Sequence, residues 1–187
     1  MDNNASVILA EGNTFSNNSE YGIRVWLAGS LVMWGNSQLT SPTTISGNTK
    51  GPIRIDEGGS ALLSNLTLAS PNKGIIIQNA NFVKLDNVTI TGSGDFGINV
   101  WGTNIGLENS TISGHTDAEI YAETSTIDLR NTAISGTAGS NEIKLTYGSK
   151  LFIGTGTTIT GTVYCDGSVD NKSIGNWINL SLTTSGC

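Results

Sequence analysis

Residues 66–131 read, in three rows of 22, LTLASPNKGIIIQNANFVKLDN (66–87), VTITGSGDFGINVWGTNIGLEN (88–109) and STISGHTDAEIYAETSTIDLRN (110–131). These rows share one pattern without a gap. The rows before and after them, TTISGNTKGPIRIDEGGSALLSN and TAISGTAGSNEIKLTYGSKLFIG, fit the same pattern with small adjustments. An earlier row runs from Thr14 to about Met33, and Val7 to Leu9 match the last strand of a row before it. Such a fixed period is typical of a solenoid.

Each row contains three short segments in which apolar residues alternate with polar ones. The first segments contribute Ile45, Leu68, Ile90, Ile112, Ile134 and Ile159, the second Val25, Ile55, Ile77, Val100, Ala122 and Leu145, and the third Met33, Leu63, Leu85, Leu107, Leu129 and Ile153. Alternation places each set on one face of a strand, so three such faces close into a tube. The sequence therefore predicts an all-β, single-stranded parallel β-helix of about seven coils and three parallel sheets. It is predicted as a single domain over residues 1–187.

Two polar residue types recur at fixed places in the rows. Four successive rows end in Asn, at Asn65, Asn87, Asn109 and Asn131. We expect these side chains to form a ladder of hydrogen bonds that satisfies buried polar groups. Glycine follows the first segment at Gly47, Gly92, Gly114, Gly136 and Gly161, where we expect a turn that needs a positive φ.

With its Ile-rich rows and its Asn ladder, the chain resembles the pectin-lyase-like family of right-handed β-helices over nearly its whole length. The resemblance implies a right-handed coil. It does not select an activity, because such folds include lyases, hydrolases, epimerases, phage spikes and adhesins.

Composition excludes two classes of partner. The net charge is −6 and Lys and Arg are scattered singly, so no basic stripe for nucleic acid is present. No run approaches the roughly 18 apolar residues of a membrane span. The N-terminus has neither the features of a signal peptide nor an amphipathic capping helix. We therefore expect the C-terminal part of a longer exported chain, able to stack on a partner through its uncovered N-terminal end.

The two cysteines, Cys165 and Cys187, lie 22 residues apart, which is one coil. Residues one coil apart stack at about 4.8 Å, within the Cα separation that a disulfide accepts. We predict a disulfide that closes a C-terminal coil over residues 165–187, with two buried free thiols as the alternative. A disulfide indicates an oxidising compartment, so the predicted location is extracellular, on the cell surface or periplasmic.

The outward positions of the second segments carry the candidate binding residues. One column reads Arg24, Arg54, Ile76, Asn99, Tyr121 and Lys144, and the other reads Trp26, Asp56, Gln78, Trp101, Glu123 and Thr146. Aromatic rings beside planar polar groups suit a glycan, whose C–H faces pack on rings while its hydroxyls need paired donors and acceptors. The glycan-binding candidates are Trp26, Arg54, Asp56, Gln78, Asn99, Trp101, Tyr121 and Glu123. The alternative is an ordinary polar face with ion pairs such as Glu123 with Lys144 and Arg54 with Asp56.

An enzymatic function is the alternative hypothesis to glycan binding. The resemblance implies that a polysaccharide lyase or epimerase of this fold would hold Ca²⁺ on acidic side chains and use Lys or Arg as a base. Acidic and basic residues occur at Arg54, Asp56 and Glu57 in one row and at Glu119, Glu123 and Lys144 in another. Asp56 and Glu123 would lie about 14 Å apart, too far for the paired carboxylates of a glycosidase. The one clear insertion, WGNSQLTSPT (34–43), contains Trp34 and no charge.

These observations predict a non-catalytic extracellular module, a rod with a glycan-binding face. Catalytic residues, metal ligands and cofactors are not assigned, and Ca²⁺ is the one ion considered. The alternatives are a fragment of a lyase or epimerase acting on acidic polysaccharide, and an adhesin-like or phage-spike-like module that stacks or oligomerises.

Two further sequence features are not part of the predicted function. His115, the single histidine, is expected to be a turn residue beside Gly114. Outward Thr and Ser residues beside the first segments, Thr67, Thr89, Thr111, Thr91, Ser113 and Ser135, resemble the hydroxyl arrays of ice-binding β-solenoids. Ala69 and Ala133 interrupt this array, so the predicted function does not depend on it.

Overall fold

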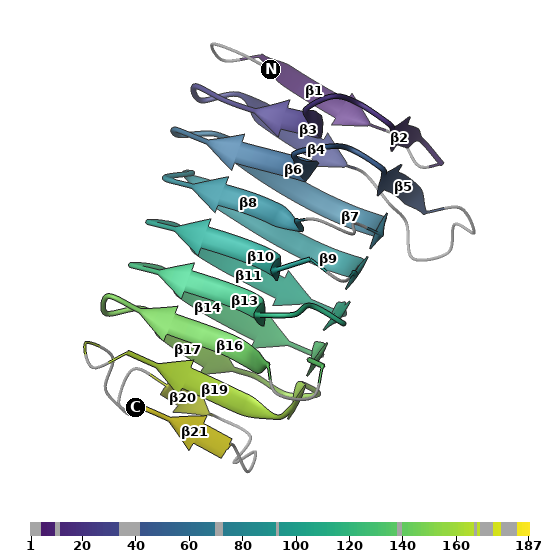
Figure 1. Ribbon diagram of the computed structural model, residues 1–187. Coiled ribbons are helices and arrows are strands. Elements are labelled where there is room, and N and C mark those ends of the chain that lie inside the picture. The colour runs from purple at the N-terminus through teal and green to yellow at the C-terminus, as the bar shows by residue number, and fades with distance from the viewer. Residues whose placement is uncertain are drawn as a thin grey trace.

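The computed structural model describes residues 5–9, 12–33, 42–69, 73–92, 94–137, 140–166, 168, 174–176 and 183–187. Every regular element among them is a β-strand, and the strands stack coil upon coil from the N-terminus to the C-terminus (Figure 1). No helix in these ranges is long and apolar enough to cross a membrane. Trp34 and most of the insertion at 34–43 lie outside the described residues.

Each coil contributes a first, a second and a third strand, and each kind stacks into its own parallel ladder. The first-strand ladder contains β2 (Thr14–Ser16), β5 (Thr43–Ser46), the last part of β7 (Ser60–Ala69), the last part of β9 (Phe82–Thr91), β12 (Thr111–Ser113), β15 (Ala133–Ser135) and β18 (Thr158–Thr160). The second-strand ladder contains β3 (Tyr21–Val25), β6 (Gly51–Asp56), β8 (Ile75–Gln78), β10 (Phe96–Trp101), β13 (Ala118–Glu123), β16 (Asn141–Thr146), β19 (Thr162–Cys165) and β21 (Thr183–Ser185). The third-strand ladder contains β1 (Ser6–Leu9), β4 (Ser30–Met33), the first parts of β7 and β9, β11 (Asn104–Glu108), β14 (Thr126–Arg130), β17 (Lys150–Ile153) and β20 (Ile174–Asn176).

The three faces predicted from the sequence are present, but two of them belong to one hydrogen-bonded sheet. The first- and third-strand ladders join through β7 and β9, so the described strands form a 13-stranded and an 8-stranded sheet. The join lies at a corner, where the pairing of β7 with β9 passes from Ser64↔Asp86 directly to Leu66↔Val88. The predicted all-β parallel solenoid of about seven coils is thereby confirmed.

The core is a continuous column of aliphatic side chains along the axis of the tube. All of the predicted inward residues belong to it, and the most exposed of them, Ile159, is only 9% exposed. Because each strand pairs with the strand one coil away, each inward residue stacks on its counterpart in the neighbouring coil. The alternation in the sequence therefore identified the core correctly.

The Asn ladder occupies the corner between the third and first strands, and its main role differs from the expected one. Asn65, Asn87, Asn109 and Asn131 all adopt left-handed backbone, with φ between 46° and 54°. The last three of them are exposed, so the expectation that the ladder satisfies buried groups was wrong for these positions. Asn tolerates positive φ better than other residues with a side chain, and this explains its recurrence at the corner.

Hydrogen bonds link the Asn side chains only in part. Asn87 Nδ2 donates to Asn65 Oδ1 at 3.2 Å, and Asn131 Nδ2 donates to Asn109 Oδ1 at 2.7 Å. Asn109 instead donates to Asp86 Oδ1 at 2.8 Å, which interrupts the ladder in the middle.

The glycines after the first strands are also of two kinds. Gly47, Gly114 and Gly161 have positive φ, with values of 64°, 85° and 134°. Gly92 and Gly136 do not, so the predicted turn conformation was wrong at these two positions.

Buried hydroxyl groups connect successive coils at two corners. At the corner between second and third strands, the backbone N–H groups of Ala80, Thr103 and Ser125 donate to the hydroxyls of Thr103, Ser125 and Ser149, at 3.0, 3.2 and 3.1 Å. At the corner beside the Asn ladder, Val88 N donates to Ser110 Oγ at 3.1 Å. These hydroxyls supply acceptors to N–H groups that lie in the interior and would otherwise lack them.

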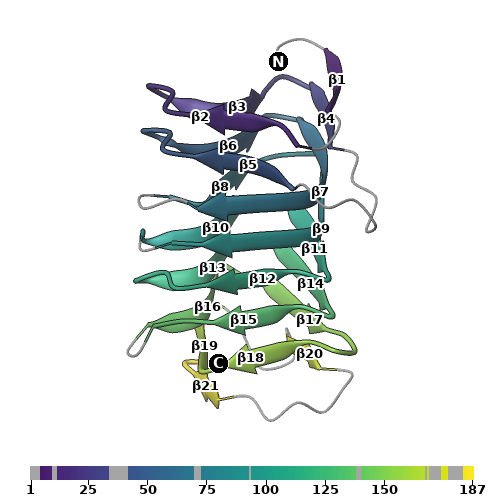
Figure 2. The same cartoon turned by 90° about the vertical axis from the view of Figure 1, so that its right-hand side faces the viewer.

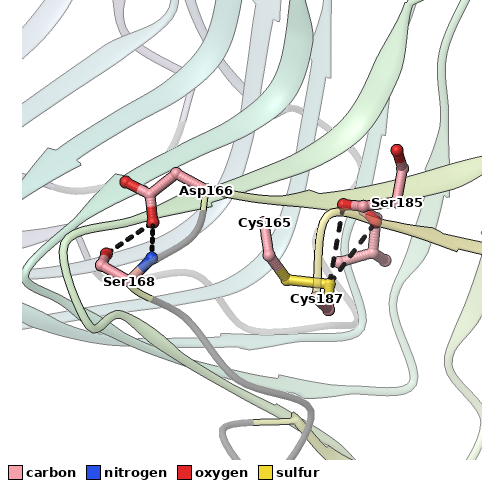
Figure 3. The surroundings of a disulfide bond; sticks show 6 residues. Cys165, Asp166, Ser168, Ser185 and Cys187 are labelled. Atoms are coloured by element: carbon pink, nitrogen blue, oxygen red, sulfur yellow. Dashed lines mark hydrogen bonds between the residues drawn. A yellow bond between two sulfur atoms is a disulfide. The ribbon is translucent and has the colours of Figure 1, made fainter.

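The structure contains the disulfide predicted between Cys165 and Cys187, with a Cα–Cα distance of 4.8 Å (Figure 3). Cys165 is fully buried at the end of β19, and Cys187 packs against the same core. The bond therefore attaches the last described strand, β21, to the coil before it. Next to it, Asp166 accepts hydrogen bonds from the hydroxyl and the backbone N–H of Ser168, and the hydroxyl bond is the main reason that the pKa of Asp166 is lowered.

Replacing both cysteines with serine is expected to lower the free energy of unfolding by about 3 kcal/mol, because a cross-link over 22 residues restricts the unfolded chain. Urea unfolding with and without a reductant measures this. The reductant should shift the midpoint of the wild-type protein and leave that of the variant unchanged. A reductant-insensitive wild-type midpoint would contradict the prediction.

Candidate functional site

The outward side of the second-strand ladder, here called the second-strand face, carries the two predicted columns of side chains in the predicted register. In one column, Arg24, Arg54, Ile76, Asn99, Tyr121, Lys144 and Tyr164 pair rung by rung. In the other, Asp56, Gln78, Trp101, Glu123 and Thr146 do so. Because strands in a ladder keep this register, every side chain on the face has a fixed neighbour one coil away.

Asp56 organises the N-terminal part of the face. This carboxylate is only 3% exposed and accepts hydrogen bonds from Arg54 Nε at 2.7 Å and from Arg24 Nε at 3.2 Å. The hydrogen bond to Asp56 is the main reason that the pKa of Arg54 is raised above its usual value. Arg54 also donates through Nη1 to Tyr21 OH at 3.0 Å and through Nη2 to Gln78 Oε1 at 3.2 Å. Its guanidinium plane is therefore held in one orientation.

Trp26 lies at the edge of this cluster. Its indole N–H donates to Glu57 Oε2 at 2.7 Å, and the guanidinium of Arg24 lies 4.6 Å from the ring centroid. The cation therefore covers part of the ring that the sequence offered as a sugar platform.

A second cluster surrounds Glu123 on the C-terminal side. Glu123 Oε2 accepts from Trp101 Nε1 at 2.8 Å and from Tyr121 OH at 3.3 Å. The ring of Tyr121 packs edge-on against Trp101, with centroids 6.4 Å apart, and lies 5.2 Å from Phe96. The pair suggested between Glu123 and Lys144 does not form, because Lys144 instead pairs with Asp117.

A hollow of about 270 Å³ separates the two clusters, and we refer to it as the central hollow. Ile76 lines it, and this buried apolar side chain takes the place in the column that the polar Arg54 and Asn99 hold in the adjacent rungs. Its other lining residues include Tyr21 and Arg54 from β3 and β6, Gln78 from β8, and Phe96, Asn99 and Trp101 from β10. Lys73 and Asp95, which precede β8 and β10, also line it.

Asn99 has an unusual place in the central hollow. Its Oδ1 atom is buried and has no hydrogen-bond partner in the described part of the chain. A buried amide oxygen without a donor is costly, and a bound group that donates a hydrogen bond would remove this cost. The hollow therefore combines an acceptor, fixed donors and aromatic rings.

The predicted site residues fall into three groups according to their position relative to the central hollow. Arg54, Gln78, Asn99 and Trp101 line it, while Asp56, Tyr121 and Glu123 hold its walls in place from outside. Trp26 does not line it. Two wall residues that the sequence analysis missed, Tyr21 and Phe96, are the first residues of their strands. An aromatic residue at the first position of a second strand is the sequence feature that could have identified them.

The acidic groups considered for catalysis are separated in space. Asp56 and Glu123 stand three rungs apart on the face. Glu119 points to the interior and is 0% exposed, paired with Nδ1 of a buried His115. His115 lies between β12 and β13, as expected of a turn residue, but its burial and its pairing with Glu119 were not expected. Within the described ranges, no three His, Cys, Asp or Glu side chains gather as a metal site would require.

Comparisons with known proteins agree with this geometry at the level of the fold. The family model described as a right-handed β-helix region matches residues 29–181 of the chain. No curated protein and no solved structure is similar enough to match.

Proposed function

Because the chain belongs to the right-handed β-helix family, we propose that it is a non-catalytic module that binds a glycan in the central hollow of its second-strand face. Right-handed β-helices serve generally as structural or carbohydrate-related modules, and the stacked coils provide a rigid support. We also infer that it stands with the pectin-lyase-like members of this family, a proposal supported by the Ile-rich coils and the Asn corner.

The observation that carries the proposal is the unpartnered Asn99 Oδ1 beside fixed donors and half-buried aromatic rings. A sugar hydroxyl can donate to this oxygen while its own oxygen accepts from Arg54 or Gln78. The C–H face of the same sugar can pack on Trp101, whose ring Glu123 and Tyr121 hold in place. Little side-chain freedom remains to be lost on binding, which favours affinity.

Replacing Trp101 with Ala is expected to weaken glycan binding about tenfold or more, because one stacking platform is lost. An array of neutral and acidic cell-wall oligosaccharides identifies the ligand, and titration calorimetry then compares the variants. Trp26→Ala is the matched control: it removes the same side chain from the same column outside the hollow and should leave affinity nearly unchanged. Equal losses in both variants would place the ligand elsewhere on the face.

The same material tests the non-catalytic part of the proposal. Incubation with acidic polysaccharides should release no unsaturated uronate and change no sugar configuration. Product formation that a chelator abolishes would instead establish a lyase or epimerase.

We further propose that the module functions outside the cytoplasm, at the cell surface, in the periplasm or in the medium. The disulfide between Cys165 and Cys187 supports this, because such bonds persist in oxidising compartments. Fractionation of the producing cells, followed by mass spectrometry of the unreduced protein, would test both points together.

A further inference from the structure

The outward side of the first-strand ladder, here called the first-strand face, carries two columns of small hydroxyl residues over seven rungs. One column contains Thr14, Thr44, Thr67, Thr89, Thr111, Ala133 and Thr158, and the other contains Ser16, Ser46, Ala69, Thr91, Ser113, Ser135 and Thr160. The strands of this ladder lie one below another across the view in Figure 2. The array thus covers seven rungs, three more than the four on which the sequence analysis named hydroxyl residues.

The two alanines interrupt this array less than the sequence suggested. Ala69 stands in one column and Ala133 in the other, three rungs apart. Each of these two rungs therefore keeps one hydroxyl, at Thr67 and at Ser135. The predicted interruptions are therefore present, but neither removes a whole rung from the array.

The hydroxyls form a lattice with two repeat distances. Neighbouring rungs repeat at about 4.8 Å along the axis, and the two residues of a rung lie about 6.7 Å apart along the strand. Strand hydrogen bonds on both sides fix the backbone of the inner rungs. Threonine is also stiff at χ1 because it is β-branched, so its hydroxyl and methyl groups occupy defined positions.

These hydroxyls face solvent and are free of other protein groups. All of the Thr and Ser side chains of the array are exposed or half-buried, and none has a hydrogen bond to another group in the described part of the chain. No hydrogen bond joins the hydroxyls of neighbouring rungs in the described part of the chain. Each is therefore available to bond to water, at positions that repeat with the lattice.

We propose that the first-strand face binds ice. The face contains neither charges nor, beyond the inward Phe15, aromatic rings, so it lacks the stacking platforms that distinguish the central hollow as a sugar site. What it offers is a regular set of hydroxyl and methyl groups. Such a surface fits a solid whose hydrogen-bonding oxygens repeat at similar distances, and ordered water is that solid. This site is independent of the glycan site.

Slow growth of ice from a dilute solution of the labelled protein tests the proposal. The wild-type protein should enter the ice and give thermal hysteresis, while an inert protein of similar size is excluded. Thr111→Tyr places a large ring in the centre of the array and should abolish both effects. Thr126→Tyr makes the same change on the third-strand face and should leave both effects at the wild-type level. Glycan binding should be the same in all of these proteins.

A gain-of-function variant tests the proposal even if Thr111→Tyr fails to fold. Ala69→Thr with Ala133→Thr completes both columns and should increase thermal hysteresis above that of the wild-type protein. Exclusion of the wild-type protein from ice, or no increase in the completed array, would overturn the proposal. So would binding to crystalline cellulose or chitin through this face in place of ice.

Discussion

Replacing Gly74 with Ala is expected to lower the free energy of unfolding by about 4 kcal/mol or more, an effect in the exceptional range for one methyl group. A Cβ atom at Gly74 would lie 1.6 Å from the carbonyl oxygen of Gly97 and 2.3 Å from its carbonyl carbon. Both are backbone atoms of the next coil, so no side-chain rotation relieves the clash. The corner would have to open, and Gly74 N would lose its 2.9 Å hydrogen bond to Phe96 O.

Gly106→Ala is the matched control for this variant. Gly106 lies within β11, and a Cβ atom there would meet no heavy atom within 4 Å. Its backbone is not left-handed, so alanine is expected to change stability by about 0.5 kcal/mol or less, or to stabilise slightly through the unfolded state. Urea unfolding followed by circular dichroism measures both variants. Similar midpoints for the two would show that the corner is not packed as described.

The second large effect is expected at the buried pair of His115 and Glu119. Replacing Glu119 with Ala should cost about 3–5 kcal/mol, since it leaves the partner of a buried pair unsatisfied. The side chains are 1% and 0% exposed, and Glu119 also accepts from the backbone N–H of His115 at 3.0 Å. His115 Nε2 already lacks a partner among the described residues, so no alternative contact compensates.

Two further variants test whether the expected cost comes from the burial of this pair or would follow from the loss of any ion pair. Glu119→Gln keeps the volume and an acceptor for His115 N, and should cost clearly less than Glu119→Ala. Glu108→Ala removes a partner of Lys84, a surface pair whose side chains are 43% and 40% exposed, and should cost at most about 1 kcal/mol. If Glu119→Ala were as mild as Glu108→Ala, the pair would not hold the interior together.

The sequence predicted the core and register of this molecule because burial repeats with the coil. Alternation identifies an inward residue such as Val100 directly, without reference to its neighbours in space. The disulfide was predictable for the same reason, since one coil of separation fixes the distance between Cys165 and Cys187.

The corners were less predictable because their chemistry depends on neighbours one coil away. Ser125 and Ser149 look like ordinary turn residues in the sequence, yet each accepts a backbone hydrogen bond from the coil before it. The turn position of His115 was predicted but its burial was not, because the burial depends on contact with the inward-facing Glu119.

The candidate site was predicted in part. Its columns followed from alternation, and Arg54, Asn99 and Trp101 were placed correctly on one face. The hollow itself depends on how side chains of adjacent rungs pack around Ile76. Outside the hollow, the guanidinium of Arg24 lies over the ring of Trp26, and this contact was not predicted either. These are properties of side chains in three dimensions, and alternation contains no information on them.

The hydroxyl corners also bear on how such a molecule can change over evolutionary time. Thr103, Ser125 and Ser149 perform the same task for three successive coils, each accepting a hydrogen bond from the coil before it. Gain or loss of one whole repeat unit in the gene would therefore leave every remaining donor with an acceptor. The length of the protein can therefore change in steps of about 4.8 Å while each coil keeps the same packing. The distance between two surfaces along the axis would change by the same steps.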